Sequence, residues 1–251
     1  MRFLVIGEVC TDIFIYGKCD RLSPEAPVPV FQPISEVRNR GMAGNVVDNM
    51  KALMQHDRLH TRQLCDEWLS DETITKTRYV DKKSNHIFLR VDVDEGIKPF
   101  KMTPEFANLS IQADVIIVSD YDKGFLDKTA LLDIADAPGV CMLDTKKKLD
   151  IDILKAYDFI KLNEYEANNS ADIIKDFPKK VIVTMGGKGT KYNEEIYPVD
   201  EVETIDVSGA GDTFMAALAF EYARGYHIQS AIQYANKMAS IVVRKRGVSV
   251  I

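Results

Sequence analysis

The residues from Asp206 to Phe214 read Asp-Val-Ser-Gly-Ala-Gly-Asp-Thr-Phe and bear more strongly on fold and chemistry than any other stretch. The small residues Ser208 to Gly211 precede a long helical pattern, so backbone N–H groups at the helix N-terminus can bind an anion. Asp212 falls in the first turn, where its carboxylate can accept the proton of a hydroxyl that attacks a phosphate. The alternative is an acidic residue that only complements the helix dipole, and the motif alone leaves both open.

Short apolar runs separated by helical patterns predict the central sheet. Five runs lack polar alternation, as strands covered on both faces do: 3–6, 115–118, 140–143, 159–162 and 181–184. Helical patterns follow at 129–135, 151–156, 164–169, 209–222 and 230–243. Alternation of strand and helix is typical of βαβ units, so we expect an α/β fold with a mainly parallel central sheet.

Two other stretches predict a smaller, separate sheet. Residues 28–37 and 73–94 are rich in β-branched and aromatic residues and partly alternate polar with apolar. This pattern favours antiparallel strands with one solvated face. With no repeat, low-complexity segment or linker in the sequence, we expect a single domain over 1–251, with β-sheet excursions near 13–38 and 73–94.

The composition excludes some classes of function. The 251 residues carry a formal net charge of −6, with 46% apolar and 28% charged residues, which argues against nucleic-acid binding through bulk electrostatics. We expect the run Lys146-Lys147-Lys148 to be a solvated turn. Four scattered cysteines without a Cys-x-x-Cys pair favour a reducing cytoplasm and no zinc site. The apolar run 3–6 is too short for a signal peptide or a membrane span.

A glycine-rich turn follows the strand pattern at 181–184, where the chain continues Met-Gly-Gly-Lys-Gly. Glycines at 186, 187 and 189 would let the backbone approach a nucleotide, although a glycine-rich hairpin turn is the commoner explanation of such a stretch taken alone. The sequence contains neither a P-loop motif nor a Gly-x-Gly-x-x-Gly fingerprint after the first strand.

The stretch Lys161-Leu162-Asn163-Glu164-Tyr165-Glu166 also follows a strand pattern. Asn163 and Glu166 lie on one face of a helical turn and could order Mg²⁺ and its waters beside phosphates. The alternative is a capping box, with Asn163 at the N-cap and Glu166 three residues later.

Candidates for sugar binding come from the N-terminal third. Gly41-Met42-Ala43-Gly44-Asn45 opens a helix, where small residues let a sugar approach and Asn45 can bond two hydroxyls. Asp12, just after the first strand, could bond a diol in the same way. Loop, cap and turn roles are the alternatives.

In this order, the motifs resemble the ribokinase-like (PfkB-type) carbohydrate kinases. Gly-Ala-Gly-Asp-Thr-Phe at 209–214 with Asp206 before it is the most specific match. Within this family, the sequence more specifically resembles the bacterial D-glycero-β-D-manno-heptose 7-phosphate kinases, which are the kinase halves of ADP-heptose synthases. It rests on the segments 7–12, 16–17, 21–30, 74–78, 89–92, 119–124 and 235–243.

The resemblance implies an α/β/α three-layer sandwich with a β-sheet lid, through which two copies often pair. It implies ATP-dependent transfer to a sugar hydroxyl, anomeric in the heptose kinases, with Mg²⁺ and a monovalent cation such as K⁺. Asp212 would be the base and Gly209, Ala210 and Gly211 the phosphate cradle. The sugar or sugar phosphate would contact Asp12, Gly41, Asn45, Arg78, Arg90 and Lys123. The nucleotide would contact Lys161, Asn163, Thr184, Gly186, Gly187, Gly189 and Asn236, and Glu166 with Asn163 would order Mg²⁺.

The sequence also departs from the family pattern. The stretch 53–73 is shorter and lacks the usual strand pattern, so we expect one βα unit to be missing at a sheet edge. Two alternatives to a heptose kinase follow. One is a kinase for ribose, fructose or a nucleoside such as adenosine, and the other is a shortened relative that binds a sugar phosphate or a partner without turnover.

Overall fold

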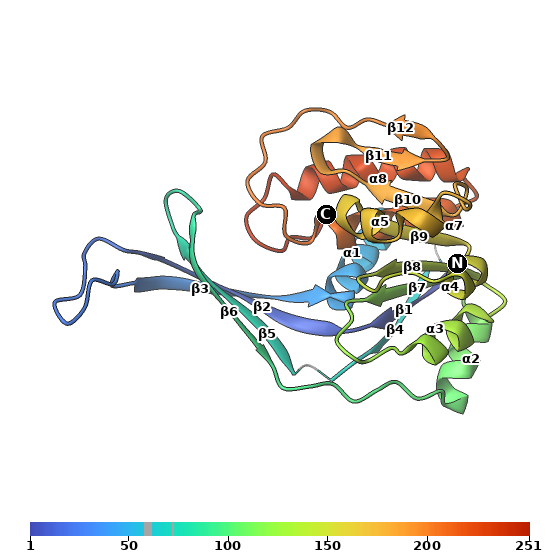
Figure 1. The fold of residues 1–251 in the computed structure, drawn as a ribbon, viewed down its shortest axis with the longest axis horizontal. Coiled ribbons are helices and arrows are strands. Elements are labelled where there is room, and N and C mark those ends of the chain that lie inside the picture. The colour runs from blue at the N-terminus through green and yellow to red at the C-terminus, as the bar shows by residue number, and fades with distance from the viewer. Residues whose placement is uncertain (58–61, 72) are drawn as a thin grey trace.

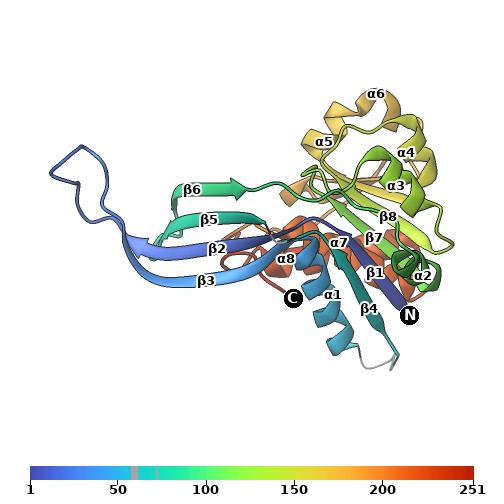
Figure 2. The ribbon, with the colours of Figure 1, turned by 90° about the horizontal axis from the view of Figure 1, so that it is seen from below.

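The computed structural model describes residues 1–57, 62–71 and 73–251, and its larger sheet has eight strands. Their order is β12-β11-β10-β9-β8-β7-β1-β4 (Figures 1 and 2). The bounds are β1 (Arg2–Gly7), β4 (Leu64–Leu69), β7 (Val115–Asp120), β8 (Val140–Thr145), β9 (Phe159–Asn163), β10 (Val181–Thr184), β11 (Thr190–Tyr192) and β12 (Glu195–Tyr197). Pairing is parallel from β10 to β4, and β11 and β12 add an antiparallel edge.

Helices cover both faces of this sheet because its strands are apolar on both sides. In β1, Phe3 and Val5 pack into one core and Leu4 and Ile6 into the other. The first core is closed by α1 (Ala43–His56), α7 (Ala210–Ala223) and α8 (Ile228–Val242). The second is closed by α2 (Pro104–Gln112), α3 (Lys128–Ala135), α4 (Ile151–Ala156), α5 (Glu164–Asn169) and α6 (Ala171–Ile174). The predicted three-layer α/β fold is confirmed.

The smaller sheet has four strands in the order β3-β2-β5-β6 and extends away from the helical layers (Figure 1). The strands are β2 (Val9–Lys18), β3 (Gln32–Met42), β5 (Ile74–Asp81) and β6 (Ile87–Asp94). The expectation of an antiparallel sheet was wrong for the central pair, because β2 and β5 are parallel. The reason lies in the larger sheet: β1 and β4 are parallel neighbours, and each leads almost directly into a strand of the smaller sheet.

The expectation that one βα unit is missing between residues 53 and 73 was wrong for its strand. β4 lies in this stretch and forms the sheet edge next to β1. Its sequence Leu-Cys-Asp-Glu-Trp-Leu has two acidic residues at its centre and no fully buried residue, unlike the continuous apolar runs used to find the other strands. Only four residues separate β4 from β5, which leaves no room for a covering helix.

Among the residues that the structure describes, no helix combines the length and apolar character needed to cross a membrane.

Candidate active site

The start of α7 offers an uncapped helix N-terminus. Gly209 precedes the helix in a left-handed conformation, with φ 80°, and no side chain from the described residues caps it. Ala210 donates its N–H to the Val207 carbonyl (3.2 Å), so it contributes less to an anion site than predicted. The N–H groups of Gly211 and Asp212 belong to the first turn, where a helix supplies no backbone acceptor. They are the donors that an anion would meet.

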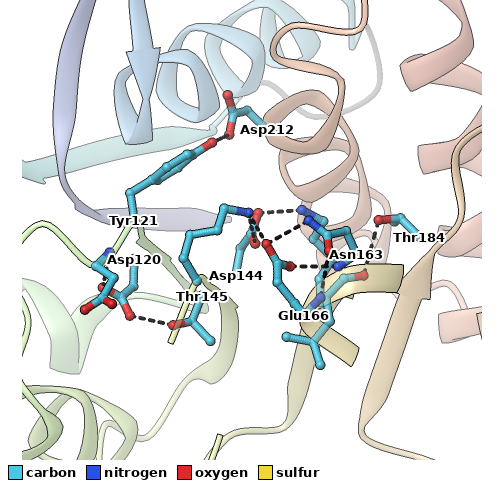
Figure 3. A network of polar contacts seen from close by, with 12 residues as sticks. Asp120, Tyr121, Asp144, Thr145, Asn163, Glu166, Thr184 and Asp212 are labelled. Carbon is cyan, nitrogen blue, oxygen red and sulfur yellow. Dashed lines mark hydrogen bonds and ion pairs between the residues drawn. The ribbon is translucent and has the colours of Figure 1, made fainter. Parts of the chain in front are cut away.

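Asp212 lies in this first turn and is only 4% exposed. Its Oδ1 accepts a hydrogen bond from the Tyr121 hydroxyl (2.6 Å; Figure 3). Its Oδ2 accepts a hydrogen bond from Asn45 Nδ2 (3.1 Å). Burial raises the pKa of Asp212 to about 6, while these two hydrogen bonds oppose the rise. Among nearby charges, Asp144 raises the pKa and Lys161 lowers it. A carboxyl group with a pKa near 6 suits a general base at neutral pH.

Asn45 is buried and hydrogen-bonded to Asp212 rather than standing open to a sugar. Its Nδ2 also lies 3.4 Å from the Gly209 carbonyl, and its Oδ1 accepts from Asn49 Nδ2 (3.0 Å). Thr213 donates to Asn49 Oδ1 (3.1 Å), which ties α1 to α7. Asn49 was not predicted, although its position four residues after Asn45 places both on one helix face.

Two lysines lie next to Asp212 and its helix. Lys161 is buried and donates to Asp144 Oδ2 (2.6 Å), and a Cβ at position 211 would lie 3.0 Å from its ammonium nitrogen. Lys146 donates to Glu166 Oε1 (2.6 Å) and its side chain is 32% exposed. These ammonium groups provide positive charge beside the helix N-terminus.

The expectation that Lys146-Lys147-Lys148 is a solvated turn was wrong for Lys147, whereas Lys146 is exposed but paired with an acid. Lys147 donates to the fully buried Asp120 (2.6 Å), which also accepts from the Thr145 hydroxyl (2.5 Å). The run follows β8 at the carboxyl edge of the sheet, where the end of β7 and the first turn of α5 supply acidic partners.

Asn163 and Glu166 form the capping box that was the alternative to a metal site. Asn163 N–H donates to Glu166 Oε2 (2.7 Å), and Glu166 N–H donates to Asn163 Oδ1 (2.9 Å). Asn163 Nδ2 adds a bond to Glu166 Oε1 (2.8 Å), so protein donors already hold this carboxylate. The described residues contain no cluster of three or more His, Cys, Asp or Glu arranged to hold a metal ion.

A cavity of about 520 Å³ lies beside the α7 N-terminus. Five of the predicted nucleotide residues line it: Thr184, Gly186, Gly187, Gly189 and Asn236. Ala210, Gly211 and Phe214 of α7 also line it, so the cavity reaches the helix N-terminus. The side-chain amide of Asn236 is hydrogen-bonded within the protein: it accepts from the Thr190 hydroxyl (2.7 Å) and donates to the Tyr197 carbonyl (2.9 Å).

Strand register places the predicted sugar ligands on one face of the smaller sheet. Cys10 lies opposite Gly41, and Asp12 lies opposite Lys76, two residues further along β2. A Cβ at position 41 would come within 2.0 Å of Asp12 Oδ2, so only glycine leaves room for this carboxylate. Asp12 is buried and accepts a hydrogen bond from Arg78, whose guanidinium lies 4.9 Å from the Phe14 ring centroid.

The other predicted cations of the sugar site are also paired with acids. Arg90 lies opposite Arg78 and donates twice to Asp92, at 2.7 Å each. Lys123 forms an ion pair with Asp94 (3.2 Å), four residues from Arg90 on β6. The structure therefore brings Asp12, Arg78 and Arg90 onto one face but places Lys123 toward the end of β6.

Comparison with known proteins agrees with this architecture. The family model "pfkB family carbohydrate kinase" matches residues 33–250. The chain is 30% identical to the bifunctional protein HldE of a Nitratiruptor species, over 98% of this chain and 62% of that protein. It is 31% identical to HldE of Caulobacter vibrioides, over 99% of this chain and 61% of that protein. It therefore spans less than two thirds of these relatives.

Among solved structures, Arabidopsis thaliana ribokinase complexed with ribose and ATP superposes with a TM-score of 0.70. The sequence identity is 16%, and the match covers 98% of this chain and 93% of that one, so it supports the fold. The family match covers most of the chain, and the curated relatives match nearly all of it. The chain belongs to the pfkB family of carbohydrate kinases.

Proposed function

We propose that this chain transfers the γ-phosphate of ATP to a sugar hydroxyl, with Asp212 as the general base. The observation that carries the proposal is the position of Asp212: a buried carboxyl group with a pKa raised to about 6, in the first turn of an uncapped helix. A kinase of this type needs few covalent steps, and positioning and charge stabilisation supply most of the catalysis.

In the proposed reaction, the acceptor hydroxyl donates its proton to Asp212 while its oxygen attacks the γ-phosphorus, and ADP leaves. The N–H groups of Gly211 and Asp212 then stabilise charge on the transferred phosphoryl group. Lys161 lies close enough to Gly211 to add a positive charge there. The nucleotide would occupy the cavity lined by Thr184, Gly186, Gly187 and Gly189.

The residues present suit a magnesium ion that takes most of its ligands from water and phosphate. Buried Asp144 has one oxygen, Oδ1, without a hydrogen-bond partner among the described residues. This oxygen can accept a hydrogen bond from a metal-bound water. Lys146 links Asp144 to Glu166 by forming an ion pair with each, and Asn163 is hydrogen-bonded to Glu166. When bound with ATP, Mg²⁺ supplies neutralisation of phosphate charge. A monovalent cation such as K⁺ and a cytoplasmic location stay predictions.

The finer proposal is that the acceptor is a sugar phosphate, such as D-glycero-β-D-manno-heptose 7-phosphate, phosphorylated on its anomeric hydroxyl. Its support is the 30–31% identity to the HldE proteins over nearly the whole chain. In addition, Arg78 and Arg90 sit opposite one another on the face of the smaller sheet that carries Asp12. Arginine can grip a phosphate with two parallel hydrogen bonds.

A sugar panel tests both levels of the proposal. ADP formation is measured with heptose 7-phosphate, ribose, fructose and adenosine at equal concentration. We expect a preference for heptose 7-phosphate. Equal or better use of another sugar would contradict the proposed substrate but not the proposed kinase activity. No phosphorylation of any sugar would favour a binding protein without turnover.

Arg90→Gln tests where the distal phosphate binds, because Arg90 is half exposed whereas Arg78 is buried against Asp12. The KM for the sugar phosphate should rise about tenfold or more, since hydrogen bonds to charged groups contribute about 1.5–3 kcal/mol. Lys98→Gln is the control, because Lys98 also pairs with an acid, Asp71, but is more exposed. An unchanged KM would place the phosphate elsewhere.

A further inference from the structure

The hydroxyl of Tyr121 occupies a position that the proposed reaction needs. Tyr121 is the first residue after β7 and donates to Asp212 Oδ1 at 2.6 Å. A substrate hydroxyl that gives its proton to Asp212 must come within about 2.6–3.2 Å of the same carboxylate. Because Asp212 is 4% exposed and Asn45 already bonds its other oxygen, little of the carboxylate is left for a second hydroxyl.

The backbone around Tyr121 is held by a buried carboxylate. Glu8, which is 0% exposed, accepts the N–H of Tyr121 (2.8 Å) through Oε2. Its Oε1 accepts the N–H groups of Lys123 (3.1 Å) and Phe125 (3.3 Å). Three bonds to one carboxylate fix the segment 121–125, so the Tyr121 side chain can move about its own bonds while its backbone stays in place.

The ring of Tyr121 spans the space between the two sheets. Lys76 of β5 lies 5.3 Å from the ring centroid and Lys146, after β8, lies 5.2 Å from it. The ring also packs against the small core of Cys10, Met42 and Ile74, beside the predicted sugar ligands. Tyr121 therefore lies between the residues proposed to hold the sugar and the residue proposed to take its proton.

We propose that the Tyr121 hydroxyl takes the place of the acceptor hydroxyl on Asp212 in the substrate-free enzyme and is displaced when the sugar binds. This inference rests on the proposed function, because it assumes that Asp212 is the base. Tyr121 acts as a positioning residue that holds Asp212 ionised and keeps water away from it until an acceptor arrives. It stays protonated throughout, since burial and the charge of Asp212 hold its pKa well above the usual value.

Two consequences separate displacement from a fixed structural contact. Without the phenol, water can reach Asp212, so ATP hydrolysis in the absence of sugar should rise. The acceptor no longer competes with an internal hydroxyl, so its KM should fall while kcat stays nearly constant. A Tyr121 that remained in place and oriented the sugar would give the opposite result, a higher KM or a lower kcat.

Tyr121→Phe removes only the hydroxyl and is the test variant. Tyr157→Phe is the matched control: Tyr157 is fully buried and its hydroxyl donates to the Leu131 carbonyl (2.9 Å), away from Asp212. Thermal unfolding of both variants checks that each is folded. Sugar-free ATP hydrolysis needs no knowledge of the acceptor, and KM is measured with heptose 7-phosphate or with the sugar that the panel selects.

We expect Tyr121→Phe to raise sugar-free ATP hydrolysis severalfold and to lower the acceptor KM roughly fivefold, the equivalent of one ordinary hydrogen bond. Tyr157→Phe should change neither. Unchanged hydrolysis together with an unchanged or higher KM would overturn the inference.

The pH dependence gives a second readout that a structural role would not change. The charged and titratable groups facing Asp212 are Tyr121, Cys10 of β2, Asp144 of β8, Lys146 after β8 and Lys161 of β9. Only the first is altered in Tyr121→Phe, and its hydrogen bond lowers the pKa of Asp212. In Tyr121→Phe, the acid limb of the kcat/KM profile, which reports the free enzyme, should move up by about one pH unit. The acid limb of the kcat profile reports the substrate complex, in which the phenol is already displaced, and it should not move.

The inference and the proposed function fail in different ways. Turnover by the Asp212→Asn variant would contradict the role of Asp212 as base, whatever the effect of Tyr121→Phe. An inactive Asp212→Asn variant, together with a Tyr121→Phe enzyme indistinguishable from wild type, would overturn the displacement alone.

Discussion

At the scale of residues, the proposed role of Asp212 as base predicts the pH range of activity. A general base must be ionised, and burial places the pKa of Asp212 at about 6. The value of kcat/KM should therefore be constant at neutral pH and should fall about tenfold per unit as the pH drops below about 6. An acid limb near pH 4, where an ordinary aspartate titrates, would show that another group is the base or that Asp212 is not buried in solution.

Glu166 gives a second prediction at this scale. Glutamine can take its place in the capping box, but it removes the negative charge beside Lys146. The loss leaves a more positive site, so the Mg²⁺ concentration for half-maximal activity should rise severalfold in Glu166→Gln.

The control for this prediction is Glu164→Gln, because Glu164 lies in the same first turn but pairs with exposed Lys188. A titration of activity with MgCl₂ compares the variants. An unchanged Mg²⁺ requirement in Glu166→Gln would leave Glu166 with the capping role alone.

At the scale of elements, the turn after β8 contributes to stability. Lys147 pairs with Asp120, which is fully buried at the end of β7. Removing one partner leaves a buried charge uncompensated, so Lys147→Ala should lower the free energy of unfolding by roughly 1–3 kcal/mol. Lys148→Ala, an exposed neighbour, should change it by less than about 0.5 kcal/mol. Urea denaturation measures both, and equal effects would show that the buried pair contributes no stability.

The elements that could be predicted well are those whose own residues carry a clear sequence pattern. Buried strands such as β7 and β8 appear as continuous apolar runs because both faces are covered. β4 was missed because this half-exposed edge strand carries two acidic residues at its centre, and Lys147 was misjudged because charge alone does not reveal a buried carboxylate on a neighbouring strand.

At the scale of the whole molecule, the order of motifs was enough to predict the three-layer fold and to place Asp212 at a helix N-terminus. The partners of Asp212 were not predictable in the same way. Asn45 and Tyr121 lie 167 and 91 residues from it in sequence and meet it only through the packing of α1 and the end of β7. Such contacts depend on side-chain conformations in the folded chain, which no local pattern encodes.

One face of the smaller sheet suits the pairing of two copies of the chain that the family resemblance implies, and we propose a homodimer through it. Leu89, Val91 and Val93 of β6 are 40–56% exposed and share the face opposite the one that carries Asp12. Exposed apolar side chains in a row are typical of an interface between chains. We expect sedimentation at twice the mass of one chain, and Val91→Glu should shift it to the monomer.

Ile111→Glu is the control for the dimer, because Ile111 is 66% exposed on α2, away from the smaller sheet. It should leave the dimer intact. A wild-type protein that sediments as a monomer at micromolar concentration would contradict the proposal, and so would a dimer unaffected by Val91→Glu.

The central claim is that Asp212 takes the proton of the acceptor hydroxyl, and Asp212→Asn tests it most directly. The variant keeps the shape of the side chain but cannot serve as a base. Phosphorylated sugar is quantified with saturating ATP and the preferred acceptor, ATP affinity is measured by calorimetry, and Asp133→Asn, an exposed change on α3, serves as control. We predict that kcat falls at least about a hundredfold while ATP affinity and folding are retained. Turnover within a few-fold of wild type would contradict the account.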